Sequence, residues 1–177
     1  MSRITRAALA VGASVAALTG VAIPAHAADA APSYVQLQAQ HSGKCLTIAN
    51  GSLRNGGNAV QSTCDDGLDN QLFELTPTGS ATFTLRAKHS GKCLEIEDRD
   101  TKAGANAQQW WCVDAPQQRW KLVLVDVAQD LYELHPSHAP NRCLDISRGS
   151  KDDGAKAQQW YCNGTEAQRW RIQPAKA

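Results

Sequence analysis

The sequence lacks an excess of charge of either sign, a long hydrophobic run beyond its first 27 residues, and any long amphipathic helical pattern. Its 18 Lys and Arg residues nearly balance 17 Asp and Glu residues, which gives a formal charge of +1. A chain so nearly neutral has no long-range positive field to attract nucleic acid or an anionic membrane surface. No segment after residue 27 is apolar over a length that could cross a bilayer. We therefore expect neither nucleic-acid binding nor membrane insertion.

The first 27 residues have the layout of a cleavable signal peptide. Arg3 and Arg6 precede an apolar Ala/Val/Leu run of about 17 residues that ends at Ala25-His26-Ala27. As a membrane anchor the run is too short, and Gly and Ser interrupt it. We expect a secreted protein with a signal peptide at 1–27 and a short linker at 28–33. Removal of two arginines and no acids changes the formal charge to −1.

The remaining chain of about 150 residues is the size of one ordinary domain. A separate catalytic domain would not fit beside such a core. All six cysteines lie in this part of the chain, and an even number of cysteines in an exported protein usually forms disulfides. Six cysteines allow 15 pairings in principle.

The cysteines mark three copies of one repeat. Cys45 and Cys64, Cys93 and Cys112, and Cys143 and Cys162 are each 19 positions apart. A Cys-Leu-x-Ile motif begins at the first cysteine of each pair, and a Gln-x-aromatic motif closes each copy at Gln71-Leu72-Phe73, Gln118-Arg119-Trp120 and Gln168-Arg169-Trp170. One copy of such a repeat cannot bury its apolar face alone, so the three copies are expected to share one core.

Short runs of alternating apolar and polar residues predict β-strands. Such runs open the copies at 34–37, 83–85 and 131–134, and another begins at each first cysteine. Gly, Asn, Asp and Pro separate the runs, as in turns. The sequence therefore predicts an all-β domain.

Three Gln-x-aromatic repeats phased with Cys-Leu-x-Ile strands resemble the ricin B-type lectins and the related carbohydrate-binding modules. The resemblance covers residues 34–173 and implies a β-trefoil of three repeats with one disulfide inside each repeat. We place the domain at 34–177 and its repeats at about 34–78, 82–126 and 131–175. The implied bridges, in keeping with the constant spacing, are Cys45–Cys64, Cys93–Cys112 and Cys143–Cys162.

If each bridge lies within its own repeat, strand alternation places further side chains on the same face as the bridge. In the third repeat these are Asp145, Gln158 and Trp160, while Leu144 and Ile146 point into the core. The second repeat gives Glu95, Gln108 and Trp110. The first gives Thr47, Val60 and Ser62, with neither an acid nor an aromatic ring. We expect two binding pockets and one degenerate copy.

The predicted groups suit a sugar, because an aromatic ring packs on the C–H face of a pyranose while a carboxylate and an amide bind its hydroxyls. The resemblance adds Gln168 to the third site and Gln117 and Gln118 to the second, with galactose- or xylose-type sugars as ligands. The family usually has Asn before the Gln of Gln-x-Trp, where this chain has Ala167 and Gln117. Glu95 is also one methylene longer than the family's Asp, so we rank the third site above the second.

The remaining aromatic and histidine residues have other interpretations. We expect Phe73, Trp120 and Trp170 in the core; Trp111 and Tyr161 lie either in the core or, if the faces are reversed, at the site. The recurring His41, His89 and His138 are interpreted as turn residues.

The acidic runs at 95–100 and 152–153 are interpreted as solvated loops, so no catalytic site, metal or cofactor is expected. The alternative to a lectin is a β-trefoil interaction protein such as a protease inhibitor, with a glycoside hydrolase third.

Overall fold

The structure is a computed structural model that describes residues 33–175. The expected signal peptide at 1–27, and nearly all of the expected linker, lie outside the described residues. Each repeat contributes four β-strands: β1 (Tyr34–Ala39), β2 (Cys45–Ile48), β3 (Gly57–Ser62) and β4 (Phe73–Gly79); β5 (Thr82–Ala87), β6 (Cys93–Ile96), β7 (Ala107–Trp110) and β8 (Trp120–Asp126); β9 (Leu131–Pro136), β10 (Arg142–Ile146), β11 (Ala157–Tyr161) and β12 (Trp170–Pro174). None of the described helices is long and apolar enough to span a membrane.

Short 3-10 helices are the helical elements among residues 33–175. One follows the second strand of each repeat: η1 (Ala49–Gly51), η3 (Glu97–Arg99) and η5 (Ser147–Gly149). Another precedes the fourth strand: η2 (Asp69–Gln71), η4 (Pro116–Gln118) and η6 (Glu166–Gln168). Their equal placement in the three repeats follows the sequence repeat.

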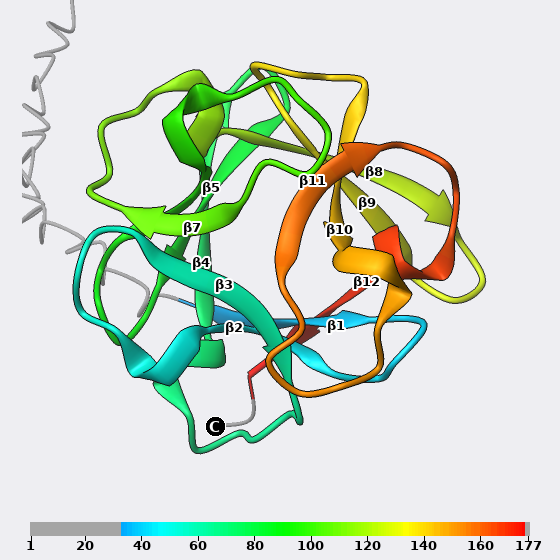
Figure 1. The fold of residues 1–177 in the computed structure, drawn as a ribbon, viewed down its shortest axis with the longest axis horizontal. Coiled ribbons are helices and arrows are strands. Elements are labelled where there is room, and N and C mark those ends of the chain that lie inside the picture. The colour runs from blue at the N-terminus through cyan, green and yellow to red at the C-terminus, as the bar shows by residue number, and fades with distance from the viewer. Residues whose placement is uncertain (1–32, 176–177) are drawn as a thin grey trace, which may run out of the picture. The chain divides into compact units, whose positions relative to one another are not determined.

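Six strands form a closed antiparallel ring, and three hairpins complete the fold. The ring runs β1-β4-β5-β8-β9-β12 and closes where β12 pairs with β1. The hairpins are β2–β3, β6–β7 and β10–β11. In Figure 1 the three repeats surround a common centre, coloured blue to cyan, green, and yellow to red. This threefold arrangement is a β-trefoil, as the sequence predicted.

The core lies inside the ring and under the hairpins. Leu144 and Ile146 are fully buried, as are their counterparts in the other repeats. Phe73, Trp120 and Trp170 also have no exposed surface, which confirms the expectation that they are core residues. The indole Nε1 of Trp120 donates to the Leu94 carbonyl over 3.1 Å, and that of Trp170 donates to the Leu144 carbonyl over 3.1 Å. Each of these two indoles therefore also satisfies a buried backbone acceptor.

Disulfides join the cysteines within each repeat, as predicted. The bridges are Cys45–Cys64, Cys93–Cys112 and Cys143–Cys162, with Cα–Cα distances of 5.0, 5.1 and 5.1 Å. Each bridge ties the start of a hairpin to the segment after its second strand. The two strands that would carry a site are thereby fixed against one another.

A histidine and a glutamine from each repeat hold a loop of another repeat. His138 Nε2 donates to the carbonyl of Asp100 over 2.9 Å, and Gln159 Nε2 donates to the carbonyls of Asp100 and Lys102 over 2.6 and 2.8 Å. The equivalent pairs His41 with Gln61, and His89 with Gln109, hold the loops at 150–152 and 52–54. The three histidines do lie in turns, as expected, and they also tie the repeats together.

Candidate carbohydrate-binding sites

The third repeat places an acid, an amide and an indole side by side on the β10–β11 hairpin. Asp145 lies directly opposite Gln158, and Cys143 lies opposite Trp160. Since Leu144 and Ile146 fill the core, Asp145 projects from the other face of the strand. Asp145 is 6% exposed, whereas the Trp160 residue is 39% exposed. The carboxylate is thus buried at the base of the hairpin face, and the indole beside it is accessible to a ligand.

Two glutamine side chains orient the Asp145 carboxylate. Gln158 Nε2 donates to Oδ1 over 2.9 Å and Gln168 Nε2 donates to Oδ2 over 3.2 Å. Gln168 is itself held, because its amide donates to the Tyr161 carbonyl and accepts from the Asn163 backbone N–H. A carboxylate has about four acceptor positions, so Asp145 retains capacity for two hydroxyl donors.

Burial is the main influence on the acidity of Asp145. Desolvation raises the pKa of the carboxyl above its ordinary value of 3.8, while the hydrogen bonds from Gln158 and Gln168 and the charge of His41 lower the pKa and offset part of that rise. The two amide donors therefore favour the ionised, acceptor form of the group against the effect of burial.

A cavity of about 870 Å³ opens over this group. Its lining includes Asp145, Gln158 and Trp160, Arg148 of η5, Lys151, and the segment 163–167. His41 of the first repeat lies in the same lining. A volume of this size is typical of small-molecule sites. Of the predicted residues, Gln168 is fully buried outside this lining and donates to Asp145.

The second repeat has the same arrangement around a longer acid. Gln108 Nε2 donates to Glu95 Oε1 over 3.0 Å and Gln118 Nε2 donates to Oε2 over 2.8 Å. Trp110 lies opposite Cys93 and is 40% exposed. Gln117 is not part of this group: its Oε1 accepts from Arg99 Nε over 3.2 Å. The structure therefore brings together four of the five predicted residues.

The first repeat keeps the backbone but not the polar group. Thr47 lies opposite Val60, and its hydroxyl donates to the Cys45 carbonyl over 2.9 Å. Gln71, the counterpart of Gln168, donates to the Thr63 carbonyl over 3.0 Å. Without a carboxylate to orient, this glutamine serves only the backbone.

Trp111 and Tyr161 lie outside the core, which corrects one of the two interpretations given for them. They are 61% and 56% exposed. Lys92 Nζ lies 3.9 Å from the centre of the Trp111 ring, and the Arg142 guanidinium lies 4.0 Å from that of Tyr161. The other interpretation, a reversed face, also fails, because Glu95 and Asp145 point away from the core. Each of these exposed rings makes a cation–π contact instead of packing in the core.

Sequence reasoning missed the cavity residues that lie outside the strands. Arg148, Lys151 and Thr165 follow no strand alternation, and His41 comes from a different repeat. The recurrence of a histidine before each first cysteine was the one available signal for His41. Its partner, the Ser150 carbonyl at 2.8 Å, lies more than a hundred residues away in sequence.

A closed six-stranded ring capped by three hairpins defines a β-trefoil protein, and two of the hairpins carry a partly exposed indole near a buried carboxylate. Three overlapping matches to the family of ricin-type beta-trefoil lectin domain-like proteins cover residues 26–110, 69–160 and 116–177. The chain belongs to this family.

Solved structures agree with that assignment. The designed threefold-symmetric protein ThreeFoil is 36% identical, with 79% of this chain and 97% of that chain covered and a TM-score of 0.75. The exo-β-1,3-galactanase 1,3Gal43A from Clostridium thermocellum is 27% identical over 80% of this chain and 30% of that chain, with a TM-score of 0.75. The Macrolepiota procera ricin B-like lectin, solved with lactose, shares the fold at 18% identity over 81% and 96% of the chains, with a TM-score of 0.65. No curated protein matches this chain.

Proposed function

We propose that the protein is a secreted, non-catalytic lectin that binds glycans through the cavity of the third repeat and, more weakly, through the second. The observation that carries this proposal is the combination of Asp145, held by two amide donors, with the accessible indole of Trp160 in one cavity. A sugar presents both surfaces that this pair would recognise, an apolar ring face and adjacent hydroxyls.

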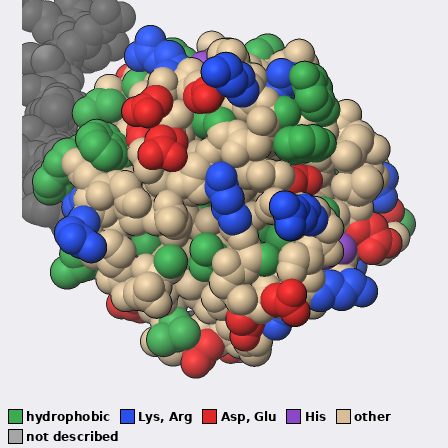
Figure 2. Space-filling model, viewed as in Figure 1, with side chains coloured by type: hydrophobic (Ala, Val, Ile, Leu, Met, Phe, Trp, Pro, Cys, Tyr) green, Lys and Arg blue, Asp and Glu red, His purple; other side chains and the backbone are tan. Residues whose placement is uncertain are grey.

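Galactose- or xylose-type sugars are the ligands proposed. Family membership supports a carbohydrate ligand, and two of the similar structures are a galactanase and a lectin that holds lactose. Figure 2 shows cationic and acidic side chains interspersed over the face drawn, with uncharged groups over most of it. That surface suits a neutral polymer better than a polyanion.

Binding without catalysis is supported by how the acids are placed. Both oxygens of Asp145 accept amide hydrogen bonds, an arrangement that favours a fixed acceptor over a proton donor. Glu97 and Asp98 lie exposed in η3, away from the cavity lining, and the other acid of the lining, Glu166, is exposed to solvent. A glycosidase would place two carboxyl groups across the scissile bond.

The test is a glycan array followed by retention on the immobilised polysaccharide that carries the best ligand. The wild-type protein should be retained, and Asp145→Ala should lower retention strongly. Thr47→Ala, a matched change at the equivalent position of the first repeat, should leave retention unchanged. A protein that bound no glycan on the array, or that bound equally well after Asp145→Ala, would contradict the proposal.

A further inference from the structure

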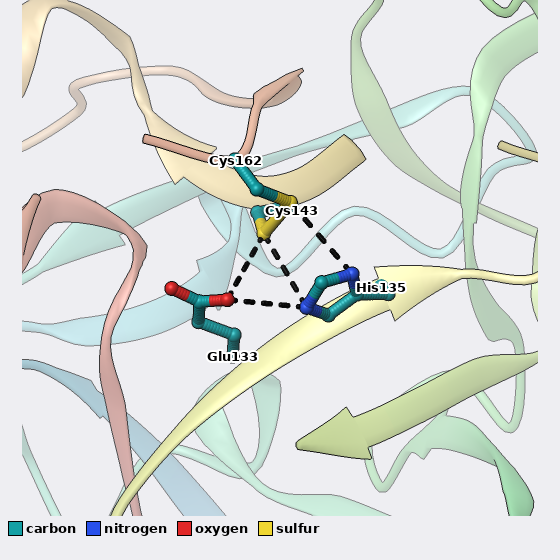
Figure 3. A group of neighbouring side chains, drawn as sticks. All are labelled: Glu133, His135, Cys143 and Cys162. Carbon is teal, nitrogen blue, oxygen red and sulfur yellow. Dashed lines mark hydrogen bonds and ion pairs between the residues drawn. A yellow bond between two sulfur atoms is a disulfide. The ribbon is translucent and has the colours of Figure 1, made fainter. Parts of the chain in front are cut away.

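The disulfide of the third repeat has two polar neighbours that suit a metal. Figure 3 shows Glu133 and His135 of β9 beside Cys143 and Cys162. One ligand atom from each of these four residues lies within 4.8 Å of the other three. The Glu133 and His135 side chains are 12% and 17% exposed, so water competes little for them.

The other two disulfides lack these neighbours. Gln36 and Gln38 occupy the equivalent positions of β1, and Thr84 and Arg86 occupy those of β5. All three repeats nevertheless place a donor on the carbonyl of the following turn: Gln38 Nε2 on Gly43, Arg86 Nε on Gly91, and His135 Nδ1 on Pro140, over 2.8, 2.9 and 3.0 Å. Gln38 and Arg86 show that this hydrogen bond to the turn does not require an imidazole. In His135 the bond uses Nδ1, so it does not occupy the second ring nitrogen, Nε2.

The second nitrogen, Nε2, faces Glu133 and Cys143, whereas Cys162 Sγ lies 3.7 Å from Nδ1. Nε2 lies 3.5 Å from Cys143 Sγ and 3.2 Å from Glu133 Oε2, and Cys143 Sγ lies 3.5 Å from the same oxygen. In tetrahedral zinc sites, with bonds of about 2.0–2.3 Å, neighbouring ligand atoms are about 3.4–3.6 Å apart. A zinc-bound histidine also usually donates its other ring N–H to a backbone carbonyl, as His135 does to Pro140.

We propose that reduction of Cys143–Cys162 creates a tetrahedral zinc site from Cys143, Cys162, His135 and Glu133. In the disulfide the two sulfurs are bonded to one another and are not thiolates. A phosphine reductant transfers two electrons to the S–S bond and takes an oxygen atom from water, whose two hydrogens become the two thiol protons. Zn²⁺ then binds both sulfurs and releases these protons to solvent, because the thiolate is the ligand form.

Zinc in this position would replace the covalent bridge between the strands of the sugar pocket. Cys143 lies opposite Trp160 and two residues before Asp145. A metal held by both cysteines and by β9 keeps β10 and the end of β11 against the ring. The inference does not depend on sugar binding and is tested without a sugar.

The experiment treats the folded full-length protein with tris(2-carboxyethyl)phosphine in the presence of Zn²⁺ or, as a control, Mg²⁺. Native mass spectrometry then counts bound metal, and iodoacetamide labelling with peptide mapping reports each cysteine separately. We expect one zinc per chain and protection of Cys143 and Cys162 only. The four remaining cysteines should be alkylated as fast with zinc as with magnesium.

His135→Gln is the matched variant, since it installs the residue that β1 carries at Gln38 and keeps the hydrogen bond to the turn. It should retain the disulfide and lose both the zinc and the protection. Cobalt(II) in place of zinc should give the visible absorption of a tetrahedral thiolate site in the wild type alone. Equal zinc in both proteins, protection spread over all six cysteines, or reduced wild-type protein that binds no zinc would each overturn the proposal.

Discussion

Replacement of Ala139 by serine should stabilise the protein, because a buried acceptor beside Ala139 lacks a partner. The amide oxygen of Gln61 accepts from the Ser42 hydroxyl over 2.8 Å. The amide oxygen of Gln109 likewise accepts from the Ser90 hydroxyl over 2.7 Å. In the third repeat Ala139 follows the histidine where the other repeats have serine, and Gln159 Oε1 is buried without a hydrogen-bond partner.

The size of the effect follows from what the hydroxyl would contribute. Ala139 is 5% exposed, so Ala139→Ser adds a buried hydroxyl whose cost is offset by the new bond to Gln159. A net gain of about 1 kcal/mol is expected for a satisfied bond to a previously unpaired buried group. In a domain of this size that gain raises the midpoint of thermal unfolding by about 2–4 °C.

Urea unfolding of three single variants measures the effect. Ser42→Ala and Ser90→Ala should each lower the free energy of unfolding by about 1–3 kcal/mol. Each change leaves the amide oxygen of the equivalent glutamine, Gln61 or Gln109, without its hydroxyl donor. Ala139→Ser should move the free energy of unfolding in the opposite direction. If Ala139→Ser destabilised the protein while both Ser→Ala changes were costly, the threefold equivalence of these positions would be refuted.

Three further predictions concern acidity, the core and the disulfides. Sugar binding by the third repeat should weaken as the pH falls through the raised pKa of Asp145, starting at a higher pH than for a carboxyl of pKa 3.8, because protonation removes an acceptor. Calorimetry from neutral to acid pH should show this loss, and Asp145→Asn should remove the pH dependence. Trp170→Phe removes the donor to the buried Leu144 carbonyl and should lower the free energy of unfolding, measured in urea, by about 1–3 kcal/mol. The free energy of sugar binding by the protein that stays folded should change by less. Joint replacement of Cys45 and Cys64 by alanine should cost about 3 kcal/mol by loop entropy, read as a lower denaturation midpoint; an unchanged midpoint would contradict it.

Strand alternation made the polar group of each hairpin predictable. Leu144 and Ile146 had to face a shared core, so Asp145 between them had to face away, opposite Gln158. The same rule applied to the second repeat, where the cross-strand partner of Glu95 is Gln108. The family resemblance and the constant spacing together predicted the disulfides, and each pair brackets one hairpin.

The positions of side chains beyond the ends of the strands could not be predicted from the sequence. β7 stops at Trp110, and the next residue, Trp111, is placed by its contact with Lys92 rather than by alternation. Gln117 lies in η4 and turns to Arg99, a partner that only the path of two loops brings near. Hydrogen bonds from another repeat fix the path of such a loop, as where the Gln159 amide donates to the Asp100 carbonyl. No local sequence signal encodes these hydrogen bonds.

Titration calorimetry with the best monosaccharide from the array tests the central claim, that the hairpin carboxylates of the second and third repeats bind sugar. A single shallow pocket should give a dissociation constant near the millimolar range, about −4 kcal/mol. Asp145→Ala should remove most of the monosaccharide binding, and Glu95→Ala should cost less. Loss of either pocket should also weaken retention on a polymer by about 10²-fold, because bivalent engagement is lost. Asp145→Ala combined with Glu95→Ala should abolish binding while the fold, followed by circular dichroism, stays intact. Undiminished binding by the folded double variant would contradict the claim and place recognition on another surface.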